Sequence, residues 1–290
     1  MQNHGKHWRP LGVATVVLGV VLSIAAADGF AAAIIKQDQP AAGSLTPLQL
    51  EIEKQRLRLG SAEIEERREA VTRLGSMHHP KASQAALSAL NDPAPIVRAT
   101  AAASILSLPA EESAANLLPL LGDKDEFVRQ QVAYALGQTR SHATVAALIE
   151  RLSDKKDSVR GAAAVALGQV GDATAVASLA AILNPQAGLT PAKKKQERKG
   201  EQNPFVMRAA AHSLGQIGSR EALPALIVVL QDEKSEADVR REAAFALGAI
   251  GDAAAIPALR EALTANDPYL SGAAYEAIRK ISRSRITGGI

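Results

Sequence analysis

Few side chains in this sequence are of the types that carry catalytic or metal chemistry. Cysteine is absent, which excludes thiolate metal sites, disulfides and a cysteine nucleophile. The six histidines are scattered, and only His212 falls on a helix expected to present a repeated surface. A lone imidazole is more often a hydrogen-bonded surface group than a ligand. Because G-x-S-x-G, P-loop and H-E-x-x-H motifs are also missing, we predict no catalytic residue, no cofactor, no metal site and no small-molecule substrate.

The densest positive charge lies in a segment that spans residues 184–203. Its basic residues are Lys193, Lys194, Lys195, Arg198 and Lys199. The whole chain has a net charge of +3, of which +2 lies in residues 1–27 and +3 in this segment, so the remainder is close to −2. No basic face is left for nucleic acid. Such a lysine run usually marks a solvated loop, and the functional alternative is an electrostatic contact with an acidic partner or anionic lipid headgroups.

The most regular feature is an arginine that recurs at a fixed spacing. The recurring positions are Arg67, Arg98, Arg129 and Arg160, followed by Met207, Arg240 and Ser271. The first four stand 31 residues apart, and the later steps are 47, 33 and 31 residues. Such self-similarity indicates a repeat architecture. The step of 47 exceeds 31 by 16, so one copy contains an insertion, which is the segment 184–203.

Each copy contains two helical patterns. The second pattern places apolar residues with a period of about 3.6, as in Val159, Ala162, Ala163, Ala166, Leu167 and Val170. The first is shorter, as in Val145, Leu148, Ile149 and Leu152. Its first position keeps the same steps along the chain, at Ser83, Ala114, Val145, Val176, Leu223 and Ile256. We therefore predict an all-α chain of about seven helical hairpins.

Turn residues separate these helices. Gly171 and Gly251 suit the left-handed residue at a helix end, and the aspartates that follow them suit an N-cap. Asp92-Pro93 and Asp267-Pro268 are expected to start helices, with proline in the first turn. Thr46-Pro47-Leu48-Gln49 has a capping-box pattern, and the first hairpin is expected to be an N-terminal cap of the array.

Two segments carry a family resemblance. Residues 157–172 (DSVRGAAAVALGQVGD) and 238–252 (DVRREAAFALGAIGD) match the pattern D-x-V-R-x-x-A-A-x-A-L-G-x-I-G-D. The sequence thus resembles the HEAT-repeat superfamily, with its armadillo-like helical fold, and specifically the PBS lyase HEAT-like repeats, over about residues 46–284. The resemblance implies an α-solenoid in which the column arginines Arg67, Arg98, Arg129, Arg160 and Arg240 are structural. Because Met207 and Ser271 break the column, the ladder of arginines should be interrupted there.

Two relatives of these repeats are enzymes. Deoxyhypusine hydroxylase places His-Glu pairs directly after the repeated arginine to hold two irons. Here those positions read Arg68-Glu69, Ala99-Thr100, Gln130-Gln131, Gly161-Ala162, Arg208-Ala209, Arg241-Glu242 and Gly272-Ala273. Phycobilin lyases handle a bilin in a cytoplasmic or stromal setting, which conflicts with the export signal described next. We therefore expect a non-enzymatic protein, with a hydroxylase-like or lyase-like enzyme as the disfavoured alternative.

The N-terminus has a composition of its own. Residues 1–10 are basic, residues 11–27 are apolar or small, and Ala25-x-Ala27 precedes Asp28, as in a secretory signal. A retained membrane anchor through residues 11–27 is the alternative. Residues 28–45 are rich in Pro, Gly, Gln and Ala, which predicts a flexible linker, and residues 285–290 are expected to form a tail. We expect an exported protein, either periplasmic or anchored in the inner membrane with the repeats on the outer side.

The expected function is a scaffold that binds a protein or peptide. Stacked hairpins form a concave face lined by the second helices, and variable residues on it select the partner. Positions one, five and nine after the arginine column share one stripe of each second helix. The candidate binding residues on this stripe are Gln130, Tyr134, Gln138, Gln169, Arg208, His212, Gln216, Arg241 and Phe245. The alternative for Tyr134 and Phe245 is that they fill gaps between repeats.

Overall fold

The computed structural model describes residues 45–184 and 203–287, with side chains as far as Arg283. Residues from Thr46 onward form one compact unit. The expected signal or anchor at residues 1–27, the linker apart from Leu45, and all five basic residues of the insertion lie outside the described residues. Among the helices of the described ranges, none is long and apolar enough to cross a membrane.

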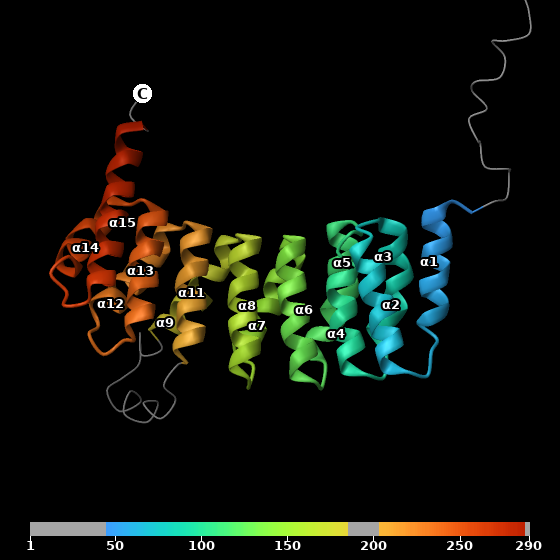
Figure 1. The fold of residues 1–290 in the computed structure, drawn as a ribbon. Coiled ribbons are helices and arrows are strands. Elements are labelled where there is room, and N and C mark those ends of the chain that lie inside the picture. The colour runs from blue at the N-terminus through green and yellow to red at the C-terminus, as the bar shows by residue number, and fades with distance from the viewer. Residues whose placement is uncertain (1–44, 185–202, 288–290) are drawn as a thin grey trace, which may run out of the picture. The chain divides into compact units, whose positions relative to one another are not determined.

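The described residues contain fourteen α-helices, which pair into seven hairpins as predicted. The first helices are α1 (Pro47–Arg58), α3 (Pro80–Ala86), α5 (Ala110–Leu117), α7 (Val145–Arg151), α9 (Val176–Leu183), α12 (Leu223–Gln231) and α14 (Ile256–Ala262). The second helices are α2 (Ile64–Ser76), α4 (Pro95–Ser104), α6 (Glu126–Thr139), α8 (Asp157–Val170), α11 (Pro204–Ile217), α13 (Ala237–Ile250) and α15 (Pro268–Thr287). Within this unit, the second helices follow one another side by side in one row (Figure 1), and the first helices pack against them as a second layer.

The apolar stripes predicted from periodicity form the core between the two layers. In α8, the residues Val159, Ala162 and Leu167 are fully buried, and in α7 Leu148 is fully buried as well. Small residues let neighbouring second helices approach closely. A Cβ atom added to Gly248 of α13 would lie 2.7 Å from the Cα of Ala277 in α15, which is closer than real Cβ contacts come. The glycine of the repeated Leu-Gly pair therefore marks a close approach between adjacent second helices.

The predicted turn chemistry is confirmed at the glycine-aspartate pairs. Gly171 has a φ of 78° and ends α8, and the Asp172 side chain accepts a hydrogen bond from the backbone N–H of Thr174. A 3₁₀ turn, Ala173–Ala175, precedes α9 and was not predicted from the sequence. The capping box at α1 is present, because the Thr46 and Gln49 side chains each accept a hydrogen bond from the backbone of the other residue.

Two predicted boundaries need correction. Helix α4 begins at Pro95, so Pro93 is not in its first turn; the Asp92 carboxylate instead accepts hydrogen bonds from Arg67 and from the backbone of Ala94. The matching prediction for Asp267-Pro268 is confirmed, since Asp267 accepts from the backbone N–H of Tyr269 and α15 starts at Pro268. At the other end, α15 extends to Thr287, three residues beyond the boundary expected at residue 284.

Candidate functional site

Three of the column arginines join one repeat to the next. The Nε and Nη2 groups of Arg129 donate to the two carboxylate oxygens of Asp154 at 2.9 and 3.0 Å. Its Nη1 donates to the carbonyl oxygens of Asp123 and Lys124 at 2.9 and 3.3 Å. Arg67 with Asp92 and Arg98 with Asp123 repeat this geometry. The side chains of the Arg129–Asp154 pair are only 6% and 5% exposed, so they present almost no surface to a ligand.

The electrostatics of these pairs follow from burial and hydrogen bonding. Burial raises the pKa of Asp154, but hydrogen bonds from Arg129 and from the backbone N–H of Lys156 outweigh that effect, and the pKa lies below its usual value. Hydrogen bonding to Asp154 raises the pKa of Arg129, which burial alone would lower. Both groups therefore stay charged, and the ion pair acts as a link between repeats.

The ladder stops earlier than the sequence analysis predicted. Arg160 bonds Asp157 of its own helix and the carbonyl oxygen of Asp154, and Nε of Arg240 donates to the carbonyl oxygen of Leu230 at 3.0 Å. Each of the first three arginines finds its aspartate 25 residues further along the chain. At that distance from Arg160 and Arg240 the sequence has proline and alanine. The interruption expected at Met207 and Ser271 thus also includes these two arginines.

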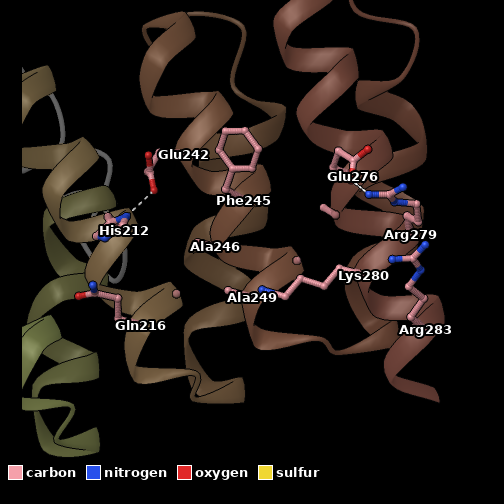
Figure 2. A pocket seen from close by; sticks show the side chains of 13 residues that line it. His212, Gln216, Glu242, Phe245, Ala246, Ala249, Glu276, Arg279, Lys280 and Arg283 are labelled. Carbon is pink, nitrogen blue, oxygen red and sulfur yellow. Dashed lines mark hydrogen bonds and ion pairs between the residues drawn. The ribbon is translucent and has the colours of Figure 1, made fainter. Parts of the chain in front are cut away.

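A groove lies across the last three second helices, and we call it the C-terminal groove. Its volume is about 800 Å³. Its lining residues are His212, Gly215 and Gln216 of α11; Glu242, Phe245, Ala246, Gly248 and Ala249 of α13; and Glu276, Ala277, Arg279, Lys280 and Arg283 of α15. Figure 2 shows these side chains, with Phe245 between α11 and α15. Three successive repeats therefore contribute to one site.

The C-terminal groove combines an apolar centre with charged sides. Its apolar lining consists of Phe245, which is 51% exposed, and of glycine and alanine residues. Nδ1 of His212 lies 2.8 Å from Oε1 of Glu242, and Nη2 of Arg279 lies 2.6 Å from Oε2 of Glu276. Lys280 reaches from α15 toward Ala249 of α13 (Figure 2). An exposed aromatic ring beside paired acids and basic side chains can hold a ligand that is both apolar and charged.

Three of the predicted binding residues meet in the C-terminal groove, namely His212, Gln216 and Phe245. Others lie apart from it. Tyr134 is partly buried and packs on the core, which agrees with the gap-filling alternative for that residue. The side-chain oxygen of Gln169 is buried without a hydrogen-bond partner among the described residues.

The remaining predicted positions do not line the C-terminal groove either. Arg208 and Arg241 both pair with Asp238, and the guanidinium of Arg241 lies 5.5 Å from the centre of the Tyr269 ring. Gln130 is half-buried, and Gln138 is exposed on α6. The lysine cluster of the insertion lies outside the described residues.

Helix α15 contributes residues to the groove that were not predicted from the sequence. Glu276 and Lys280 line the C-terminal groove, and they stand five and nine residues after Ser271, at the same offsets used for the other second helices. The sequence therefore contains the signal for these two residues, although serine replaces the arginine in this last copy. Glu242, Arg279 and Arg283 lie outside the stripe, and only the structure shows that they join the site.

Possible metal ligands do not gather in the described part of the chain. Within residues 45–184 and 203–283, no group of three or more His, Cys, Asp and Glu side chains is placed to hold a metal ion. His212 pairs with Glu242, as expected for a histidine that is hydrogen-bonded at the surface.

Several solved structures have a fold similar to that of this chain. A solved structure of the YibA protein of Escherichia coli matches with a TM-score of 0.55 at 21% identity, over 81% of this chain and 82% of that one. A structure of the complex of CpcE and CpcF of phycocyanin lyase from Nostoc sp. matches with a TM-score of 0.49 at 21% identity, over 87% of this chain and 92% of that one. The structure of human deoxyhypusine hydroxylase matches with a TM-score of 0.40 at 20% identity, over 80% of this chain and 84% of that one. The YibA likeness shows the fold alone, and the two lower scores support no statement about activity.

The family is shown by sequence. A comparison with curated proteins gave no match. The family model described as HEAT repeats matches residues 54–137, 114–189 and 196–279, which together make up most of the chain. These matches extend from within α1 to within α15 and confirm the resemblance found in the repeated segments. The chain therefore belongs to the HEAT-repeat family.

Proposed function

We propose that this protein is a non-enzymatic HEAT-repeat scaffold that binds a protein or peptide partner on the face formed by its second helices. The observation that supports this proposal most directly is the C-terminal groove, with a half-exposed phenylalanine at its centre. Covering an exposed aromatic ring with a partner removes apolar surface from water and lowers the free energy of the complex. Aromatic and arginine side chains are frequent anchors of protein interfaces. The ring is carried by α13, which packs closely against α15 at Gly248 and Ala277.

The first test is capture of the partner by the full-length protein and by Phe245→Ala. The alanine variant should recover about tenfold less of any partner that crosslinks to the wild-type protein in cells, because it removes the apolar centre of the groove. Tyr275→Ala is the matched control, since Tyr275 is 59% exposed on neighbouring α15 but does not line the groove. The crosslinked partner is identified and quantified by mass spectrometry.

Equal recovery of the partner by Phe245→Ala, with a circular dichroism spectrum like that of the wild type, would place the binding surface elsewhere. A stoichiometric metal or chromophore in the purified protein would instead favour the enzymatic alternative. Elemental analysis and a visible absorption spectrum detect either one.

We also propose that the protein is exported and that its repeats lie on the outer side of the membrane, as a periplasmic or a membrane-anchored protein. The proposal rests on the basic, apolar and Ala-x-Ala segments of residues 1–27. Fractionation followed by intact-mass measurement should give either a chain that starts at Asp28 or an intact chain in the membrane fraction. An intact chain in the cytosolic fraction would contradict the proposal.

A further inference from the structure

The outer side of helix α1 is more apolar than the end of a repeat array should be. Helix α1 lies at one end of the row of hairpins and buries Ile52 and Gln55 (Figure 1). The opposite side of α1 carries Leu50 and Leu57, which are 56% and 81% exposed. Among the described residues, no other large apolar side chain is as exposed as Leu57. Terminal repeats normally have a polar outer side, because no neighbouring repeat covers it. This side of α1 therefore offers apolar surface for a further contact.

Two charged residues flank these leucines, one on each side. Leu50 and Leu57 are seven residues apart, so they lie nearly in line along the helix, about 10.5 Å from each other. Because an α-helix turns by about 100° per residue, Glu53 lies on one side of this line and Lys54 lies on the other. Both charged residues are exposed. We call these four residues the α1 face.

The charges of the α1 face have only weak partners within the chain. Oε1 of Glu53 lies 3.3 Å from Nη1 of Arg56, and the two side chains are 49% and 58% exposed. Exposed ion pairs within one helix contribute little, because water screens them. Lys54 forms no ion pair or hydrogen bond with another described residue. Since a carboxylate can accept several hydrogen bonds, Glu53 can keep Arg56 and still accept from a second partner.

We propose that the α1 face binds the α1 face of a second copy of this chain, with the two helices parallel and related by a two-fold axis. Each leucine then meets the same leucine of the second copy. On each side of this apolar seam, Glu53 of one copy faces Lys54 of the other, because the two-fold rotation exchanges the two sides. An antiparallel pair would instead place Glu53 beside Glu53 and Lys54 beside Lys54. The charges therefore favour the parallel pair.

This contact goes beyond the proposed function and uses a different surface. It is closed, because both copies use the same face and no α1 face remains free. It contains one helix from each copy, which places it among the small, reversible interfaces. Because α1 belongs to the first hairpin and the C-terminal groove to the last three, both grooves of the dimer stay open. A partner with two binding segments would therefore bind the dimer more tightly than a single copy.

Sedimentation velocity of the purified full-length protein, over a series of concentrations, tests the inference. The wild-type protein should change from monomer to dimer as its concentration rises. Leu57→Glu should raise the dissociation constant of the dimer about tenfold or more, because it places a carboxylate of each copy in the apolar seam. Val228→Glu is the matched control, since Val228 is a 47%-exposed apolar residue of α12, the first helix of the sixth hairpin. The control should dimerise like the wild type.

Charge exchange tests how the two helices pair. Glu53→Lys gives the α1 face two lysines and Lys54→Glu gives it two glutamates, so each variant alone should dimerise about tenfold more weakly than the wild type. An equimolar mixture of the two variants should form dimers again, because every lysine then faces a glutamate. The double variant Glu53→Lys with Lys54→Glu should dimerise like the wild type. Added salt should reduce the differences among these variants.

Several results would overturn the inference. If the wild-type protein stays monomeric at every concentration, the α1 face has another occupant, and crosslinking from Lys54 would identify it as residues 1–44 of the same chain or as another protein. A dimer that Leu57→Glu leaves unchanged would lie on another surface. Single charge variants that dimerise like the wild type, or a mixture that dimerises no better than they do alone, would exclude the parallel pair. None of these substitutions touches the C-terminal groove, so partner capture by wild type and Phe245→Ala tests the scaffold function separately.

Discussion

Arg129→Ala is expected to lower the free energy of unfolding by about 2–4 kcal/mol. The substitution removes four hydrogen bonds, two to Asp154 and two to backbone carbonyls. It also leaves the Asp154 carboxylate, whose side chain is 5% exposed, without its main counter-charge. Because repeats are stabilised mainly by their contacts with immediate neighbours, the loss affects the interface in the middle of the array most strongly. Equilibrium unfolding in urea, followed by circular dichroism, measures the change.

Arg240→Ala is the matched control for this prediction. Arg240 occupies the same column, but a single hydrogen bond is described for it, from Nε to the carbonyl oxygen of Leu230. Its replacement should lower the free energy of unfolding by only about 1 kcal/mol. If the two variants unfold at the same urea concentration, the bidentate aspartate contributes little, and the column arginines act through their aliphatic stems alone.

The repeat period explains why most of the fold could be predicted from the sequence. Two columns with the same steps, one beginning at Arg67 and the other at Ser83, determine the number of hairpins without any knowledge of their packing. The helix ends were predictable where one residue decides the local geometry. Gly171 and Gly251 have the positive φ values expected of them, and Thr46 forms the expected capping box.

The errors arise where a side chain has a distant partner. Asp92 was expected to start a helix, but the chain places it next to Arg67, and the helix begins three residues later. The ladder of arginine–aspartate pairs ends early for a similar reason. Each pair requires an aspartate 25 residues after the arginine, and the arginine alone does not form it. A second column of aspartates at that distance predicts both the position of Asp92 and the end of the ladder.

The candidate site was only partly predictable for a related reason. The stripe of offsets located Phe245 and His212 correctly on the exposed face of their helices, but it treated Tyr134 as equivalent to Phe245. Tyr134 is partly buried against the core, whereas Phe245 is half exposed in a groove. Exposure of a large side chain depends on the residues of the neighbouring helices, and a pattern within one helix does not contain that information.

Gly248→Val is expected to lower the free energy of unfolding by about 2–3 kcal/mol. A glycine within a helix destabilises it by about 1 kcal/mol relative to alanine, so its presence at this position requires a structural reason. Here the reason is the close approach of α13 and α15. A Cβ atom at residue 248 would lie 2.7 Å from the Cα and 2.8 Å from the Cβ of Ala277. Since the nearer atom is backbone, no rotamer change relieves the clash, and the two helices must separate.

Gly272→Val is the matched control, because it makes the same change in α15 at a position where an added Cβ would meet nothing within 4 Å. Its free energy of unfolding should stay within about 0.5 kcal/mol of the wild type. Both variants are compared with the wild type by urea unfolding. If Gly248→Val unfolds at the same urea concentration as Gly272→Val, close packing is not the role of this glycine. Because Gly248 and Ala277 also line the C-terminal groove, helix separation should in addition weaken partner binding, whereas the control should leave binding unchanged.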